Sequence, residues 1–119
     1  MQFIIMTFGD RSGLEGRSKG WVLEMLAFLQ GIDEELEASG ELVEQRSLAD
    51  PSEGKTVHMD AGLPYTANEP FVAPARSLSG YWVVEVVDEA RALEIATEVT
   101  VFLQDSVEVR QVLEERTVD

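Results

Sequence analysis

Two stretches of the sequence are apolar at consecutive positions, and they constrain the fold more than any other feature. The first is residues 2–8, Gln-Phe-Ile-Ile-Met-Thr-Phe, and the second is residues 81–86, Tyr-Trp-Val-Val-Glu-Val. Because successive side chains of a strand point to opposite faces, an extended segment of this kind is apolar on both sides. We therefore expect residues 2–8 and 81–86 to be the two central strands of one sheet.

Two amphipathic helices are predicted from helix caps and from apolar residues at helical spacing. Ser18 is a suitable N-cap for the first, and Ser39-Gly40 supplies the glycine expected just after its end. Asp88 is a suitable N-cap for the second, which is predicted to run through Val99. The residues expected to face the core are Val22, Met25, Leu26, Leu29, Ile32 and Leu36 in the first helix, and Ala92, Leu93, Ala96 and Val99 in the second.

A β-hairpin is predicted over residues 55–66. Its two arms, residues 55–59 and 63–66, flank the turn residues Asp60-Ala61-Gly62. Pro64 has no backbone N–H to donate, which places the second arm at an edge.

The order of elements predicts an α+β fold for a single domain spanning residues 1–119. A more polar strand over residues 41–48 follows the first helix, and a half-exposed strand over residues 106–112 follows the second. The order is therefore β-α-β, hairpin, β-α-β, a ferredoxin-like split βαβ arrangement with an inserted β-hairpin. Two helices cover only one side of such a sheet. The apolar opposite side needs a second layer, and sheet-on-sheet packing in a homodimer is the simplest source of one.

The chain is strongly acidic, with 23 Asp and Glu against nine Lys and Arg and a formal net charge of −14. This charge repels the phosphates of nucleic acids and of anionic membrane surfaces, so we expect no nucleic-acid partner and no membrane partner. The absence of cysteine excludes disulfides, thiolate catalysis and Cys-ligated metals. No basic segment precedes the short apolar run at residues 3–6, so a signal peptide is not indicated and a cytoplasmic location is expected.

Four features follow one another along nearly the whole chain. They are a first strand that ends in Gly9-Asp10, the segment Asn68-Glu69-Pro70-Phe71, the element Leu78-Ser79-Gly80-Tyr81, and the closing segment Ser106-Val107-Glu108-Val109-Arg110. In these features the sequence resembles the YCII-related family, and within it the Asp-Gly-Pro-Phe (DGPF) branch of small bacterial proteins. The resemblance implies a dimeric α+β barrel.

The chain departs from that branch at the positions that carry charge. The branch signature opens with Asp-Gly where this sequence has Asn68-Glu69, and residues 72–76 lack most of the charged group that follows it. Characterised relatives in the wider family use a His-Asp pair with the histidine near the start of the first helix, whereas residues 18–39 contain no histidine. The resemblance therefore implies the family fold with its acidic site lost.

Two residues are candidates for proton transfer. His58 is the only histidine, and on its strand it shares a face with Thr56 and Asp60, so it is a candidate general base with a carboxylate nearby. Glu69 is the only carboxylate left in the signature, and it would act as an acid or base if burial raised its pKa. The alternative for both is an exposed or structural role.

Four residues are candidates for binding a small organic ligand. Asn68 would hydrogen-bond the ligand where the family has Asp, or close a turn through its side chain. Arg76 would bind a ligand carboxylate, or pair with a surface acid. Tyr65 and Tyr81 would line an aromatic pocket, or belong to the core.

Three functions stay open on the sequence. The first is a homodimeric small-ligand-binding or accessory protein, and the second is a cofactor-independent lyase or isomerase of small organic acids that uses His58 or Glu69. The third is a regulatory protein whose acidic surface meets a basic partner, because the resemblance implies family members encoded near alternative sigma factors. Neither a metal nor a cofactor is predicted, since one histidine and scattered carboxylates show no ligand spacing and Gly13-x-x-Gly16 lacks the lysine of a phosphate loop.

Overall fold

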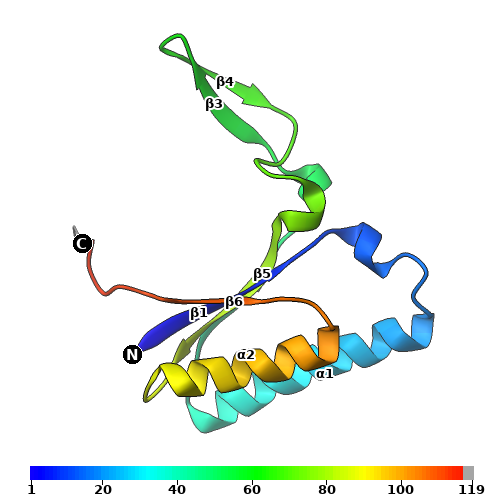
Figure 1. The fold of residues 1–119 in the computed structure, drawn as a ribbon, viewed down its shortest axis with the longest axis vertical. Helices are drawn as coiled ribbons and strands as arrows, with labels where there is room; N and C mark the ends of the chain where they lie inside the picture. The colour runs from blue at the N-terminus through cyan, green and yellow to red at the C-terminus, as the bar shows by residue number, and fades with distance from the viewer. Residues whose placement is uncertain (117–119) are drawn as a thin grey trace.

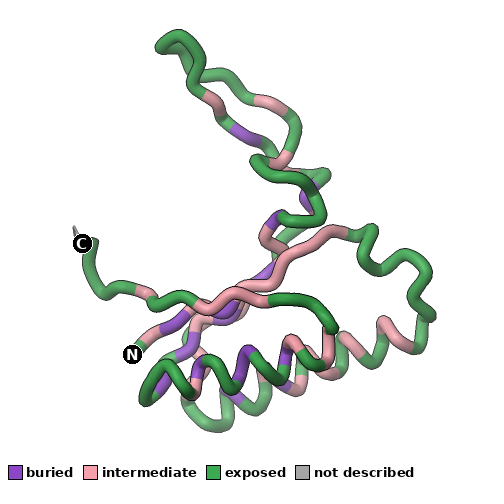
Figure 2. The backbone as a smooth tube through the Cα atoms, in the orientation of Figure 1, coloured by how far each residue is buried: buried purple, intermediate pink, exposed green. Residues whose placement is uncertain are grey.

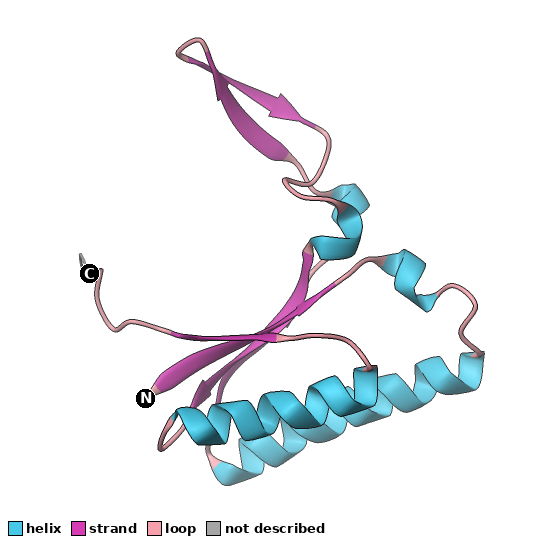
Figure 3. Cartoon of the chain, in the orientation of Figure 1, coloured by secondary structure: helices cyan, strands magenta, loops and turns pink. Residues whose placement is uncertain are grey.

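The structure, a computed structural model, describes residues 1–116 and shows an α+β fold in a βαβ-like arrangement (Figures 1 and 3). A four-stranded antiparallel sheet carries the two α-helices, and a separate two-stranded hairpin projects from it. The elements in chain order are β1 (Gln2–Phe8), η1 (Arg11–Leu14), α1 (Lys19–Ser39), β2 (Leu42–Ser47), η2 (Pro51–Glu53), β3 (Thr56–Asp60), β4 (Leu63–Ala67), η3 (Pro74–Arg76), β5 (Leu78–Glu85), α2 (Glu89–Leu103) and β6 (Glu108–Gln111).

The strand order of the large sheet is β2-β5-β1-β6. This order confirms that the two stretches apolar on both faces are the central strands. Phe3 of β1 lies opposite Val84 of β5, and Ile5 lies opposite Trp82. The edge strands β2 and β6 are both shorter than predicted, because pairing covers only part of residues 41–48 and 106–112.

The core lies between one face of the sheet and the two α-helices, which both cover that face (Figure 2). The side chains of alternate residues on β1 and β5 meet those of the buried stripes on α1 and α2. The buried apolar residues are Phe3, Ile5, Ile32, Leu36, Trp82, Val84, Val86, Ala92, Ile95, Ala96 and Val99.

The predicted helix caps are present. The Ser18 hydroxyl accepts a hydrogen bond from the backbone N–H of Trp21 at 3.0 Å, and the Asp88 carboxylate accepts one from the backbone N–H of Arg91 at 3.0 Å. Gly40 ends α1 in the left-handed conformation, with φ of 79°. No α-helix within residues 1–116 is long and apolar enough to span a membrane.

The prediction that Leu26 and Leu93 face the core is wrong, and Val22 and Met25 are half-buried and lie outside the core. Leu26 and Leu93 are 54% and 48% exposed. Leu93 lies on the outer side of α2, because the buried stripe of that helix runs through Ala92, Ile95, Ala96 and Val99. The second helix also continues beyond the predicted end at Val99, to Leu103.

Leu26 is exposed because α1 is longer than the sheet it covers. At about 1.5 Å per residue, the 21 residues of α1 span roughly 31 Å, whereas the seven residues of β1 span roughly 23 Å. The buried residues of α1, Ile32 and Leu36, both lie in its C-terminal half. The N-terminal half of α1 therefore extends past the end of the sheet, and its apolar side chains have no strand to pack on.

The hairpin forms a sheet of its own and turns more tightly than predicted. Asp60 pairs with Leu63, so the turn consists of Ala61 and Gly62 alone, with positive φ angles of 49° and 82°. Positive φ at both central residues is typical of a type I′ turn, whose twist matches that of the two arms. β3 and β4 pair with each other and with no strand of the large sheet.

The other face of the large sheet carries no helix of residues 1–116 (Figure 1). By strand alternation, Ile4 and Met6 of β1 and Tyr81 and Val83 of β5 point to this face, and all four are half-buried. We call this surface the open face of the sheet. The second layer expected over this face from the sequence stays a prediction.

Gly80 is required where β5 passes close to β2. A Cβ atom at this position would lie 2.9 Å from the carbonyl oxygen of Arg46 and 3.6 Å from the Cα of Ser47, so the two strands would have to move apart.

We expect Gly80→Ala to lower the free energy of unfolding by about 1–3 kcal/mol. Gly31→Ala is the matched control: its Cβ would meet nothing within 4 Å, and a glycine in a helix interior costs about 1 kcal/mol relative to alanine. Urea unfolding that shows G80A to be as stable as G31A would contradict this assignment.

An ion pair joins Arg91, in the first turn of α2, to Glu41, the residue before β2. The Arg91 guanidinium donates to both carboxylate oxygens of Glu41, at 2.9 Å each, and these hydrogen bonds lower the pKa of Glu41. Because folding lowers the pKa of Glu41, the ion pair stabilises the folded chain fully at pH values above the pKa that Glu41 has in the unfolded chain. This stabilisation is lost as the pH falls through the lower pKa that Glu41 has in the folded chain. We expect Glu41→Gln to lower the free energy of unfolding by about 1 kcal/mol at pH 7, and to lower it progressively less below about pH 4. A difference between the two proteins that stays constant from neutral to acidic pH would refute this role.

Candidate functional site

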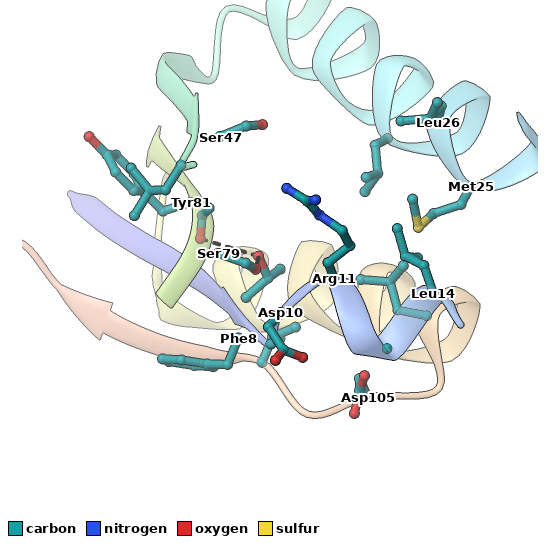
Figure 4. Close-up of a pocket in the computed structure, with 18 of the residues that line it drawn as sticks. Phe8, Asp10, Arg11, Leu14, Met25, Leu26, Ser47, Ser79, Tyr81 and Asp105 are labelled. Carbon is teal, nitrogen blue, oxygen red and sulfur yellow. Dashed lines mark hydrogen bonds between the residues drawn. The ribbon is translucent and has the colours of Figure 1, made fainter. Parts of the chain in front are cut away.

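A cavity of about 610 Å³ lies where α1 extends past the end of the sheet (Figure 4). Its wall is built from η1, the N-terminal half of α1, the end of β2 with the residues that follow it, the start of β5 and the loop after α2. These segments are far apart in the sequence. They converge because β1 and β2 end, and β5 begins, at the same end of the sheet. The loop after β1 then crosses that end of the sheet to reach the start of α1.

One side of the cavity is apolar. It consists of side chains that α1 does not bury against the sheet, together with Leu14 of η1. Figure 4 shows Leu14, Met25 and Leu26 gathered on this side. The residues of α1 that line the cavity with apolar side chains are Trp21, Met25, Leu26 and Leu29. The overhang of α1 thus supplies an apolar wall that faces a cavity instead of a strand.

Two arginines line the cavity, Arg11 and Arg17. The Arg17 guanidinium lies over the Trp21 ring, whereas Arg11 begins η1 shortly after the end of β1. Its backbone N–H donates to the Asp50 carboxylate at 2.8 Å, which fixes the start of η1 against the segment after β2. Its side chain extends between Ser47 and the apolar wall of α1 (Figure 4). No carboxylate oxygen of residues 1–116 lies within 4.0 Å of the Arg11 guanidinium.

The acidic groups around the cavity are mostly engaged with the protein. Hydrogen bonds from Ser52 and from the backbone N–H of Arg11 lower the pKa of Asp50, so this carboxyl is ionised at neutral pH. The Asp33 carboxylate accepts a 2.6 Å hydrogen bond from the indole N–H of Trp82. Asp10 accepts a hydrogen bond from the Ser12 hydroxyl. These bonds hold the carboxylates in place around the cavity and leave the guanidinium as the group most available to a ligand.

Two further contacts shape the cavity. The Arg17 guanidinium carbon lies 4.3 Å from the centre of the Trp21 ring, a cation–π contact that holds this indole at the rim. The Thr7 and Ser79 hydroxyls are 2.8 Å apart and share a hydrogen bond where β1 ends beside the start of β5. Both tryptophans of the chain, Trp21 and Trp82, line the cavity.

The cavity can therefore hold a small amphipathic anion. A planar guanidinium presents paired donors that match a carboxylate. The apolar wall beside it would cover an aliphatic or aromatic body. Among residues 1–116 no group of three or more His, Asp or Glu side chains is placed to hold a metal ion.

The structure separates the sequence-predicted site residues into two places. Tyr81 lies at the margin of the cavity, and its ring points away from Arg11 (Figure 4), as its place on the open face requires. Asn68 and Arg76 do not line the cavity. They lie after β4 and in η3, on the segment that leads from the hairpin back to β5.

His58, Tyr65 and Glu69 lie together on the hairpin. The His58 and Tyr65 rings stack with centres 5.0 Å apart, and His58 Nε2 lies 4.0 Å from a Glu69 carboxylate oxygen. The backbone carbonyl of Glu69 accepts a 2.7 Å hydrogen bond from the Thr56 hydroxyl, which closes the base of the hairpin. The carboxylate beside His58 is therefore Glu69, whereas the sequence predicts Asp60, and neither His58 nor Glu69 lines the cavity.

Arg11 is not among the candidate site residues predicted from the sequence. The available signal was an arginine immediately after a central strand, in a chain with only nine basic residues. No protein-family model matches the chain, and no curated protein matches it.

Proposed function

We propose that this protein binds a small organic carboxylate in the cavity between α1 and the end of the sheet. The observation that carries the proposal is Arg11, whose guanidinium faces an apolar-walled cavity and has no carboxylate partner within residues 1–116. In a chain with a net charge of −14, carboxylates to pair with an arginine are abundant. An arginine left without one beside an apolar wall is placed to receive an anion from outside.

The charges around Arg11 favour a singly charged ligand. Asp10, Asp33, Asp50 and Asp105 all line the same cavity. Against these four carboxylates the lining residues offer two arginines, and Arg17 is stacked on Trp21. A phosphate dianion would be repelled, whereas one carboxylate is matched by the Arg11 guanidinium. The ligand is therefore expected to carry a single carboxylate.

The rest of the ligand is expected to be apolar. The wall of Trp21, Met25, Leu26 and Leu29 offers no hydrogen-bonding side chain other than the indole N–H. A volume of about 610 Å³ lies within the roughly 300–1,000 Å³ range of small-molecule sites. A short acyl chain or an aromatic ring would fill this space and cover apolar surface that is now exposed to water.

The frame of this site is proposed to be a homodimeric, ferredoxin-like DGPF-type domain that forms a dimeric α+β barrel. The strand order β2-β5-β1-β6 and the inserted hairpin support this fold type. The open face supports self-association, because its apolar centre of Ile4, Met6, Tyr81 and Val83 lacks a second layer within residues 1–116.

The charge distribution also favours pairing through the open face. Each of its carboxylates has a cation beside it: Glu44 pairs with Arg46 at 3.3 Å, Glu85 with the N-terminal amine at 3.5 Å, and Glu108 with Arg110. By contrast, α1 carries five acidic residues against one lysine, and α2 carries three against one arginine. Two copies of an acidic chain repel each other least where the charges are balanced, which points to the open face and away from the helices.

The ligand proposal predicts charge-selective binding that depends on Arg11. Octanoate and its uncharged analogue octanamide are titrated against the full chain while tryptophan emission is followed, because both tryptophans line the cavity. We expect octanoate to bind more tightly than octanamide, and Arg11→Gln to weaken octanoate binding by about ten- to hundredfold, since a hydrogen bond to a charged group contributes roughly 1.5–3 kcal/mol.

Arg76→Gln is the matched control, because Arg76 is an exposed arginine outside the cavity. Octanoate affinity should be the same in R76Q as in the wild type. Equal affinity for acid and amide, or an R11Q variant that binds octanoate as the wild type does, would overturn the proposal.

The dimer proposal predicts that a charge at the centre of the open face separates the copies. We expect the wild-type chain to sediment as a dimer, and Val83→Asp to shift it to a monomer with unchanged far-UV circular dichroism. Val101→Asp, which places the same charge on an exposed valine of α2, should leave the dimer intact. A dimer that survives V83D but not V101D would move the interface to the helices.

A further inference from the structure

The β3–β4 hairpin projects from the body of the molecule (Figure 1), and most of its residues are exposed (Figure 2), several large apolar ones among them. Val57 and Met59 of β3 are 70% and 71% exposed, although such side chains are usually buried. Leu63 and Tyr65 of β4 and Phe71 beyond it are exposed as well. These residues make the hairpin the part of the chain where exposed apolar side chains gather.

The two faces of the hairpin differ. Cross-strand partners share a face, so Val57 lies with Thr66, and Met59 with Pro64. This face carries no charged residue. The opposite face carries the stacked His58 and Tyr65 and the Asp60–Leu63 pair. We call the Val57–Met59 side the apolar face of the hairpin.

The base of the hairpin is fixed. The Thr56 hydroxyl donates to the Glu69 carbonyl at 2.7 Å, and the Ser77 hydroxyl donates to the Val72 and Ala73 carbonyls at 3.3 Å. Gly54 packs so closely at this point that a Cβ would lie 3.0 Å from the Pro51 carbonyl oxygen. These contacts hold the base of the hairpin, whose strands β3 and β4 project from the body and pair with no strand of the large sheet (Figure 1).

A two-stranded hairpin that packs on nothing is at best marginally stable in water. An exposed apolar patch of this kind generally marks an interaction surface. The charge of the hairpin indicates which partner it suits. Residues 55–72 contain one lysine against one aspartate and one glutamate, a formal charge of −1, while the whole chain carries −14. A basic partner would be drawn to the acidic helices, whereas a second acidic chain is tolerated only at surfaces of low charge.

We propose that the hairpin is a dimerisation arm whose apolar face, Val57 and Met59 with Pro64, packs on a second copy of this chain. The inference rests on the homodimer of the proposed function, and it adds a second contact to that of the open face. Residues 68–77, which include η3, connect the hairpin to β5, whose Tyr81 and Val83 lie at the centre of the open face. Both surfaces are apolar with nearly balanced charge, which is what an acidic chain needs in order to associate with itself.

Two matched substitutions test the arm. Val57→Asp places a charge on the apolar face of the hairpin. Val87→Asp places the same charge on another exposed valine, two residues beyond the C-terminal end of β5 and away from the hairpin. In sedimentation over a dilution series, we expect the V57D dimer to dissociate at concentrations at least about tenfold higher than the wild-type dimer, as a loss of about 1.4 kcal/mol would cause. The V87D dimer should dissociate as the wild type does.

The outcomes separate the arm from the dimer itself. A wild-type dimer that V83D disrupts and V57D leaves unchanged would overturn the arm and keep the open-face dimer. A wild-type chain that is monomeric at every concentration would overturn both.

Hydrogen exchange of the wild-type chain gives a second test that needs no variant. We expect the backbone amides of β3 and β4 to exchange more slowly as the chain concentration rises, because docking covers the hairpin in the dimer alone. Exchange of these amides that is equally fast in monomer and dimer would overturn the arm. Far-UV circular dichroism of V57D, expected to match the wild type, checks that the variant is folded.

Discussion

The antiparallel pairing of β1 with β5 is the interaction on which the rest of the structure depends. Its register sets Phe3 opposite Val84 and Ile5 opposite Trp82, and these four side chains form the sheet side of the core. The same register sends the alternate residues of both strands to the open face. A one-residue slip of β1 would exchange the two faces of that strand, placing Ile4 and Met6 under the helices and Phe3 and Ile5 on the open face. One pairing thus decides both where the helices pack and which surface is left for a partner.

The same pairing determines where the cavity forms. The register shifts by one residue between Thr7 and Phe8, and Gly9 follows with φ of 135°, so β1 leaves the sheet at a turn that L-residues rarely adopt. Arg11 comes directly after this turn, at the edge that α1 overhangs. The cavity is left where α1 extends past the sheet and β1 ends. Its apolar wall comes from α1, and Arg11 comes from the loop after β1.

Local patterns predicted the parts of the fold that local physics determines. Ser18, Asp88 and Gly40 marked helix ends through their own backbone and side-chain chemistry, and the doubly apolar strands marked the centre of the sheet. Leu26 and Leu93 were misplaced because spacing alone does not show how far a helix extends past its sheet, or which edge of an apolar stripe turns outward. The end of α2 was placed too early because no glycine or proline follows Val99; the helix ends instead at Gln104 with φ of 58°.

The candidate site was less predictable than the fold, because it is assembled from segments that lie far apart in the sequence. Arg11, Ser47 and Asp105 come to line one cavity only through strand pairing and helix packing. Motif reasoning instead selected residues 65–76, which the structure places on the hairpin and on the segment that joins it to β5. His58, Tyr65 and Glu69 do form a cluster there, and the apolar side chains beside them favour a role in association.

The central claim is that Arg11 receives a carboxylate within the cavity, and nuclear magnetic resonance tests it most directly. Octanoate is titrated into the uniformly ¹⁵N-labelled full chain while the arginine side-chain N–H and tryptophan indole N–H resonances are followed. The account predicts saturable shifts of the Arg11, Trp21 and Trp82 side-chain signals, with the Arg76 signal unchanged. Shifts that spread evenly over the arginines, or cavity signals that do not move at saturating octanoate, would contradict it.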